Sequence, residues 1–266
     1  KYFNVITDTL GEPSDTTPEG KAQYAYTDVV RASAEDIASC DMVLARMYAP
    51  YVAGSAKDVE GGDPVFYPAS LQYAEYTAVN AKDPAIGNKD VIEQYFDGYD
   101  TLSREVVQNR SYKGNSAGPA STYAHLEMLD EVTALAGDVP VVVVMTAHGS
   151  SGGGSMVWTE VEPKADAIIW AYENFEDFSE ALLMTAAGKA EPEGLLVVQM
   201  PKDMDAVEAQ ADDLVRDTEC YVDANGNTYD FAFGMNWSGV INDERVQKYS
   251  AAPLTECENL DFFYAN

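Results

Sequence analysis

Residues 121–145 read STYAHLEMLDEVTALAGDVPVVVVM, and this stretch decides which fold is expected. Its first part predicts a helix from Ser121 to Ala136, because apolar residues recur at helical spacing and a glycine follows as a stop signal. Its second part, Val139–Met145, is rich in β-branched residues and lies between turn formers, which predicts a buried strand. The apolar positions of the helix are Leu126, Leu129, Val132 and Leu135, and the stop is Gly137.

The same alternation of helix and strand signals continues on both sides of this stretch. Strands are expected at Asp41–Ala45, Asp166–Tyr172 and Leu195–Val198. Helices are expected over 33–39 with Ser33 as N-cap, from Pro68 through Ala78, around Asp90–Phe96, and from Phe178 to Thr185 with Gly188 as the stop.

This order predicts an α/β fold, because alternating strands and helices build a largely parallel sheet with helices on its faces. We expect a three-layer α/β sandwich with about six strands and a C-terminal hairpin extension. The expected organisation is an N-terminal arm over residues 1–27, the sandwich over 28–201 and the extension over 202–266. Ligands of such folds bind at the carboxyl ends of the strands.

The composition excludes several classes of partner. The 266 residues contain 16 Lys and Arg against 45 Asp and Glu, so the net charge is −29. Such acidity argues against binding to nucleic acid, and equally against adhesion to an anionic membrane. The longest apolar run, Val139–Met145, is too short to span a bilayer.

The cysteines and histidines give no metal-site pattern. Cys40, Cys220 and Cys257 form no CxxC pair, and the chain has 2 histidines, so we expect no structural zinc and no other metal. Two arrangements of the thiols are open: a Cys220–Cys257 disulfide, or three unpaired residues.

Residues 223–227 begin like a calcium-binding loop. The EF-hand pattern needs Gly at the sixth position and Glu at the twelfth, where this chain has Thr228 and Gly234. Asn225-Gly226 between two apolar segments instead predicts a hairpin turn.

Two loops contain candidate site residues. His148 follows the strand Val139–Met145 in a glycine-rich loop, which would place it at the functional edge of the sheet; the alternative is a flexible connector. Glu60 lies in the segment Glu60-Gly61-Gly62-Asp63. Such a loop can bring a carboxyl into a cleft as a general acid, and the alternative is a solvated surface carboxyl.

Several segments together resemble the C-terminal domain of glycoside hydrolase family 3, which includes β-glucosidases. These are Gly194–Pro201, Tyr229–Trp237 and the expected strands Val139–Met145 and Asp166–Tyr172. The resemblance therefore covers roughly residues 33–241. Glu193 and Val197 depart from the family, which has Ser and Pro there. Ala45-Arg46 and Glu60–Asp63 match the family pattern S-R-x-x-G-E-G-x-D-R, with a longer loop and with Pro64 in place of the last Arg.

The resemblance implies retaining hydrolysis of a glycoside by two carboxyl groups. Glu60 would be the acid/base, Asp63 and Arg46 would bind substrate together with His148, and no cofactor would be needed. The nucleophile would belong to an N-terminal (β/α)₈-like barrel, the partner domain, which needs about 250 residues. The resemblance and the acidity imply an extracellular or cell-envelope location in a bacterium, with the cytoplasm as the other choice.

Two alternatives come from other classes of protein. The departures at Glu193 and Val197 and the longer loop favour a non-catalytic carbohydrate-binding or scaffold module of the same fold, and the third hypothesis is a flavodoxin-like ligand binder. Because the chain starts at Lys1 without an initiator Met, we expect it to be part of a longer polypeptide.

Overall fold

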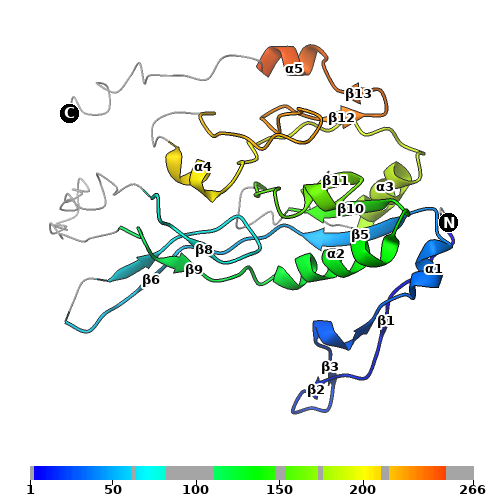
Figure 1. Ribbon diagram of the computed structural model, residues 1–266, viewed down its shortest axis with the longest axis horizontal. Helices are drawn as coiled ribbons and strands as arrows, with labels where there is room; N and C mark the ends of the chain where they lie inside the picture. The colour runs from blue at the N-terminus through cyan, green and yellow to red at the C-terminus, as the bar shows by residue number, and fades with distance from the viewer. Residues whose placement is uncertain are drawn as a thin grey trace, which may run out of the picture.

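The structure is a computed structural model that describes residues 3–61, 64–81, 111–147, 154–172, 176–210 and 216–249. These residues form a mixed α/β fold around a parallel sheet of three strands, with small two-stranded antiparallel sheets beside it (Figure 1). The sheet consists of β5 (Val43–Tyr48), β10 (Val141–Thr146) and β11 (Ala167–Ala171), with β10 in the middle. The α/β class is therefore confirmed, and three parallel strands stand where about six were expected.

The register of the sheet divides its side chains between two faces. Val143 pairs with Ala45 on one side and with Ile168 on the other, and Met145 pairs with Met47 and Trp170. Side chains alternate along a strand, so these paired residues share one face. They belong to the main hydrophobic core. Val143 on one face of β10 and Val144 on the other are both buried, so its run of valines fits a strand that is buried on both faces.

Helix α2 (Tyr123–Ala136) covers this core beside β5, as its sequence predicts. Leu126, Leu129, Val132 and Ala136 are buried, and Leu135 packs against the core while partly exposed. The helix ends at Gly137, which has a φ of 57° that disfavours residues with a Cβ. The predicted helix and the strand that follows it are confirmed.

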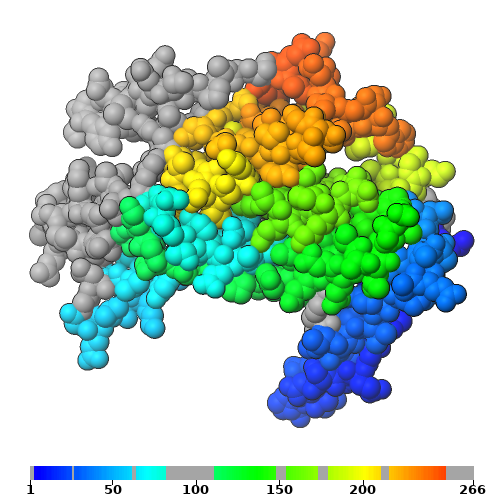
Figure 2. Space-filling view, viewed as in Figure 1, coloured from blue at the N-terminus to red at the C-terminus, as the bar shows by residue number. Residues whose placement is uncertain are grey.

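The N-terminal arm extends away from the sheet (Figures 1 and 2). It contains β1 (Thr9–Leu10) paired with β4 (Val29–Val30), β2 (Asp15–Thr16) paired with β3 (Ala22–Gln23), and the short helix η1 (Tyr26–Asp28). Arg31 holds the arm to the body through ion pairs with Asp8 at 2.6 Å and with Glu131 of α2 at 2.9 Å. The arm is followed by α1 (Ala34–Ala38), where Ser33 accepts a hydrogen bond from the Asp36 amide, so the predicted N-cap is confirmed.

The helix predicted after Pro68 is wrong. Strand β7 (Val65–Tyr67), which pairs with β6 (Ser55–Lys57), ends just before Pro68. The segment after Pro68 contains turns and β8 (Tyr76–Thr77), which pairs with β9 (Ser116–Ala117). The backbone amides of Tyr73 and Ala74 donate to the Glu160 carboxylate at 2.6 and 2.9 Å. A distant carboxylate thus satisfies two amides in a turn, and sequence periodicity cannot reveal such a contact. The helix expected at Asp90–Phe96 lies outside the described residues.

The later part of the chain begins with α3 (Glu176–Ala186), which is followed by Gly188 as predicted. Leu195–Val198, expected as a strand, is not one; only isolated backbone bonds link it to Ala232 and Phe233. The remaining elements are η2 (Glu162–Lys164), α4 (Met204–Ala209), β12 (Met235–Asn236) paired with β13 (Gly239–Val240), and α5 (Glu244–Tyr249). None of the helices in the described ranges has the length and hydrophobicity that crossing a bilayer requires.

The turn predicted at Asn225-Gly226 is confirmed. Val222 and Thr228 form an antiparallel bridge across it, and Gly226 has a φ of 83°. The Asp223 carboxylate accepts bonds from the backbone amides of Asn225 and Asn227. Burial opposes its ionisation, but these bonds and one from the Asn227 side chain outweigh it and lower the Asp223 pKa. The carboxylate is therefore used within the turn.

Candidate functional site

The carboxyl edge of the parallel sheet is where an α/β fold normally binds its ligand. Strands β5 and β10 end together at this edge, because Tyr48 and Thr146 are partners in the register. Thr146 is buried, whereas Tyr48 is partly exposed and Arg46 is exposed on the same face of β5. Of these two described strand ends, β5 therefore supplies the exposed polar side chains.

Arg46 lies against Tyr48. Its Nη2 donates to the Tyr48 hydroxyl at 3.1 Å, and its Cζ lies 5.5 Å from the centre of the Tyr48 ring. The other arginines of the described ranges, Arg31, Arg216 and Arg245, are paired with carboxylates. Within those ranges Arg46 has no carboxylate at salt-bridge distance, so its guanidinium charge is available to a ligand.

His125, in the first turn of α2, stands beside the same tyrosine. Its Nδ1 accepts a hydrogen bond from the Tyr48 backbone amide at 2.9 Å, and the two rings are 5.7 Å apart. Burial lowers the pKa of His125, as does the positive charge of Arg46. The imidazole is therefore neutral at pH 7, and we place its proton on Nε2 because Nδ1 accepts.

A second layer of contacts fixes the end of β5. The buried Tyr73 hydroxyl donates to the Tyr48 carbonyl at 2.6 Å, and the Tyr73 amide is held by Glu160. Burial and the negative charge of Glu160 raise the pKa of Tyr73, so its hydroxyl keeps its proton and remains a donor. These bonds give Tyr48, and with it Arg46, a defined position.

The sequence-predicted site residues are only partly described. Arg46 lies at the carboxyl edge of the sheet, as expected. Glu60 lies in the turn of the β6–β7 hairpin, where it is exposed and precedes Gly61 with its φ of 73°. No hydrogen bond between Glu60 and Arg46 occurs among the described contacts. Asp63 and His148 lie outside the described residues.

Glu208 of α4 is a candidate acid that sequence reasoning did not single out. Its Oε2 accepts from the Tyr112 hydroxyl at 3.2 Å, and it is partly buried. Burial is the largest cause that raises its pKa, and Asp205 raises it further, while hydrogen bonding to Tyr112 and Tyr76 opposes the rise. A raised carboxyl pKa is the property that a general acid needs. No sequence signal distinguishes Glu208, because it is one of 45 acidic residues.

The aromatic side chains near the sheet differ in their exposure. Trp158 is only 2% exposed and packs edge-on against Trp170 and Tyr229, with ring centres 5.3 and 5.9 Å apart. Its role is therefore core packing. Tyr51 is partly exposed. Cys40 and Cys220 are free thiols among the described residues, and Cys257, the other half of the alternative disulfide, lies outside them.

The described residues contain no group of three or more His, Cys, Asp or Glu side chains suited to a metal ion. Among the described residues, the sheet edge offers hydrogen-bond donors: a guanidinium, a phenol and a neutral imidazole. Such a set can bind the hydroxyl groups of a polyol or an oxyanion.

Comparison with known proteins points to one class of enzyme. A stretch of 60 residues is 47% identical to a protein of the fungus Emericella nidulans (strain FGSC A4). That protein is named beta-glucosidase C. The stretch covers 23% of this chain and 9% of the relative, so the match concerns a small part of both. No protein-family model matches the chain, and no solved structure matches it at a significant level.

Proposed function

We propose that this chain is part of a glycoside hydrolase of the β-glucosidase kind. The observation that carries the proposal is the 47% identity over 60 residues to beta-glucosidase C. The α/β fold and the donor groups at the edge of its sheet are compatible with binding a sugar. In the same proposal β5, β10 and β11 belong to a largely parallel sheet of about six strands. The outer edge of β5 is blocked, because the Tyr48 amide there donates to His125 instead of to another strand. Further strands would therefore lie beyond β11, at the opposite edge of the sheet.

The reaction would be retaining hydrolysis of an O-glycosidic bond. Two carboxyl groups about 5–5.5 Å apart flank the scissile bond in such enzymes, one as nucleophile and the other as acid and then base. In this proposal Glu60 is the acid/base, with Asp63, Arg46 and His148 binding the sugar. The nucleophile comes from a (β/α)₈-like barrel in the same protein, which joins this chain to form a secreted or cell-envelope enzyme.

The exposure of Glu60 supports the need for a second domain. A general acid in a glycosidase works in an apolar setting, and the exposed Glu60 has no such setting among the described residues. The β6–β7 hairpin projects from the body of the molecule (Figure 1), so a docking domain can enclose its turn. We therefore expect the 266-residue chain alone to have no hydrolytic activity.

The test is made on the complete protein from the parent gene. Glu60→Gln should lower kcat/KM about 10²–10⁴-fold for an alkyl glucoside, whose leaving group needs the acid. For an aryl glucoside with an acidic phenol, release of the phenol should be affected far less. Glu75→Gln, which removes another exposed carboxyl, serves as the control. An equal loss with both substrates would contradict the acid role, and a selective loss in Glu208→Gln instead would assign that role to Glu208.

A non-catalytic carbohydrate-binding module is the second candidate function. It is favoured by the solvent-exposed Glu60, which has no hydrogen-bonding partner among the described contacts. A parent protein that binds glucosides at equilibrium, but hydrolyses neither alkyl nor aryl forms, would support this function over the enzyme.

A further inference from the structure

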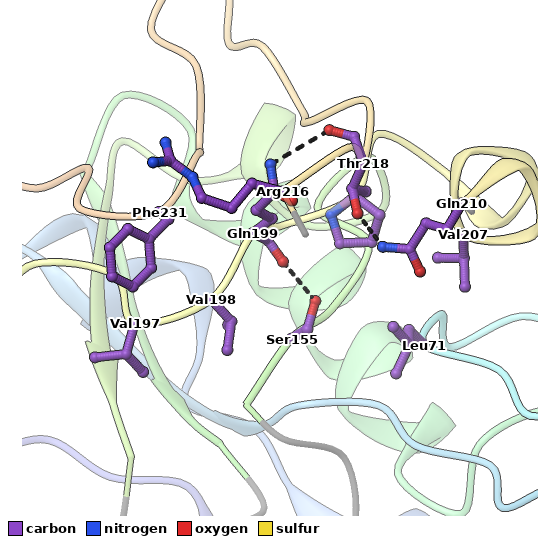
Figure 3. Close-up of a pocket in the computed structure, with 11 residues that line it drawn as sticks. Leu71, Ser155, Val197, Val198, Gln199, Val207, Gln210, Arg216, Thr218 and Phe231 are labelled. Atoms are coloured by element: carbon purple, nitrogen blue, oxygen red, sulfur yellow. Dashed lines mark hydrogen bonds between the residues drawn. The ribbon is translucent and has the colours of Figure 1, made fainter. Parts of the chain in front are cut away.

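A hollow of about 350 Å³ lies between α4 and the segment of residues 197–201 (Figure 3). Its volume is at the lower end of the range of small-molecule sites, roughly 300–1,000 Å³. It therefore fits a ligand of one ring better than an oligomer. None of the predicted site residues lines it.

The lining of the hollow is apolar in one part and polar in another. Val197, Val198, Val207 and Leu71 supply aliphatic surface, and Gln210 and Thr218 supply an amide and a hydroxyl (Figure 3). A ligand that matches both parts has an apolar face and a rim of hydroxyl groups.

Hydrogen bonds hold the polar groups of the hollow in place. The Gln210 amide donates to the Thr218 hydroxyl, and the Gln199 amide donates to the Thr218 carbonyl at 3.5 Å. The Ser155 hydroxyl donates to the Gln199 carbonyl at 2.9 Å (Figure 3). Groups that are already positioned lose little entropy when a ligand binds.

Among the described residues, the positive charge beside the hollow is paired with a carboxylate. Arg216 pairs with Asp230 at 3.1 Å, donates to the Tyr249 carbonyl at 2.6 Å, and lies 5.3 Å from the centre of the Phe231 ring. An anionic ligand would have to displace Asp230, in a protein with a net charge of −29. A cationic ligand would meet the guanidinium. The balance therefore favours a neutral ligand.

The backbone of Arg216 is strained, which indicates that its position is enforced. Its φ of 62° lies in the left-handed region, where a residue with a long side chain pays a conformational cost. The bonds to Asp230 and Tyr249 offset this cost and keep the guanidinium at the wall of the hollow.

We propose that this hollow is a second sugar site, which takes one neutral pyranose ring with its CH face on the valines and its hydroxyls toward Gln210 and Thr218. The choice of a sugar among neutral ring-shaped polyols rests on the proposed function. The site binds without chemistry: Cys220 lies behind Gln199, and burial raises its thiol pKa to about 11, so it stays protonated.

The test is equilibrium binding of methyl β-D-glucopyranoside to the 266-residue chain, measured by protein-observed NMR and by calorimetry. We expect saturable shifts at Val197, Val198 and Thr218. Val207→Phe, which fills the hollow, and Gln210→Leu, which keeps the size but removes the amide, should each weaken binding at least about tenfold. Val222→Phe, at a position that is 51% exposed and outside the hollow, should leave it unchanged.

Three results would overturn the proposal: no saturable shift up to the solubility limit of the glycoside, binding that survives both lining variants, or equally tight binding of cyclohexanol. Thermal unfolding of each variant establishes that it folds, and Gln210→Leu keeps the test valid if Val207→Phe does not. This experiment measures binding and not turnover, so it can succeed even if the complete protein hydrolyses no glycoside. Failure of the second sugar site and failure of the proposed function are therefore distinguishable.

Discussion

At the scale of single residues, His125 shows how one side chain ends a sheet. The Tyr48 amide points away from β10, toward the unpaired edge of β5, where an orphan donor would be costly or would recruit another strand. His125 Nδ1 accepts from this amide, so it both satisfies the donor and blocks the edge. This acceptor role requires the neutral imidazole.

The role of His125 predicts a pH-dependent stability. Because its folded-state pKa is below the ordinary 6.5, the unfolded state binds more protons as the pH falls. Its contribution is full above about pH 6.5 and is lost below that value. His125→Asn keeps an acceptor that does not titrate, so its melting temperature should fall less between pH 7.5 and 5.5 than that of the wild type. His125→Ala should lose about 1 kcal/mol at pH 7.5. Equal slopes in wild type and His125→Asn would contradict the assignment.

Gly234 is required for a different reason, which is space. A Cβ at this position would lie 2.3 Å from the Gly194 carbonyl oxygen and 2.9 Å from Leu195 Cδ2. The two segments around Gly194 and Gly234 cannot move apart freely, because the Leu196 amide donates to the Phe233 carbonyl at 2.7 Å next to this contact. We expect Gly234→Ala to cost about 1–3 kcal/mol in denaturant unfolding. Gly118→Ala, at a site with open space, should stay within about 0.5 kcal/mol; an equal effect of the two would show that the close approach is not what matters.

At the scale of elements, the helix α2 is the part on which the sheet depends most. Leu129 is 0% exposed and lies in the core with Val143 and Met145 of β10. We expect Leu129→Ala to lower the free energy of unfolding by about 2–5 kcal/mol, because it opens a cavity where β10 packs. Glu127→Ala on the exposed face of the same helix should change it by less than about 0.5 kcal/mol. A loss below about 1 kcal/mol for Leu129→Ala would mean that α2 is not packed on the sheet as described.

The elements also show which parts of the fold can be predicted from sequence. Residues 121–145 and the strand at 167–171 follow from periodicity and β-branched runs, because local pattern and burial agree there. The segment after Pro68 has helical spacing, yet Glu160, far along the chain, takes two of its amides and holds it in turns. Leu195–Val198 has a strand composition but meets the chain near Phe233 through isolated bonds. Contacts between distant segments decided both cases.

The candidate site follows the same division. The position of Arg46 at the edge of the sheet follows from its place on a predicted strand, although its contacts with Tyr48 and His125 depend on the tertiary fold. Glu60 was singled out by a motif, and the structure places it on an exposed hairpin. Glu208 has no motif, and only burial beside tyrosines distinguishes it from the other acids.

At the scale of the whole molecule, the charge of −29 limits what the chain can bind. The 16 Lys and Arg can neutralise only part of the 45 Asp and Glu, so the remaining carboxylates repel one another. The negative charges of the protein do not repel a neutral sugar, whereas they repel an anionic ligand. Both proposed sites fit this limit, because one offers uncharged donors around Arg46 and the other has an arginine balanced by Asp230.

The same repulsion predicts that salt stabilises the fold. The screening length falls from about 30 Å at 0.01 M salt to about 8 Å at 0.15 M, so repulsion between exposed carboxylates weakens while the buried core is unaffected. We expect the melting temperature to rise over this range of NaCl, and to rise equally with tetramethylammonium chloride. Sugar binding in the hollow beside α4 should not change with salt, because its ligand is neutral. A rise with sodium or calcium but not with tetramethylammonium would indicate specific cation binding instead of screening, and a fall in melting temperature would show that the ion pairs at Arg31 and Arg216 outweigh the repulsion.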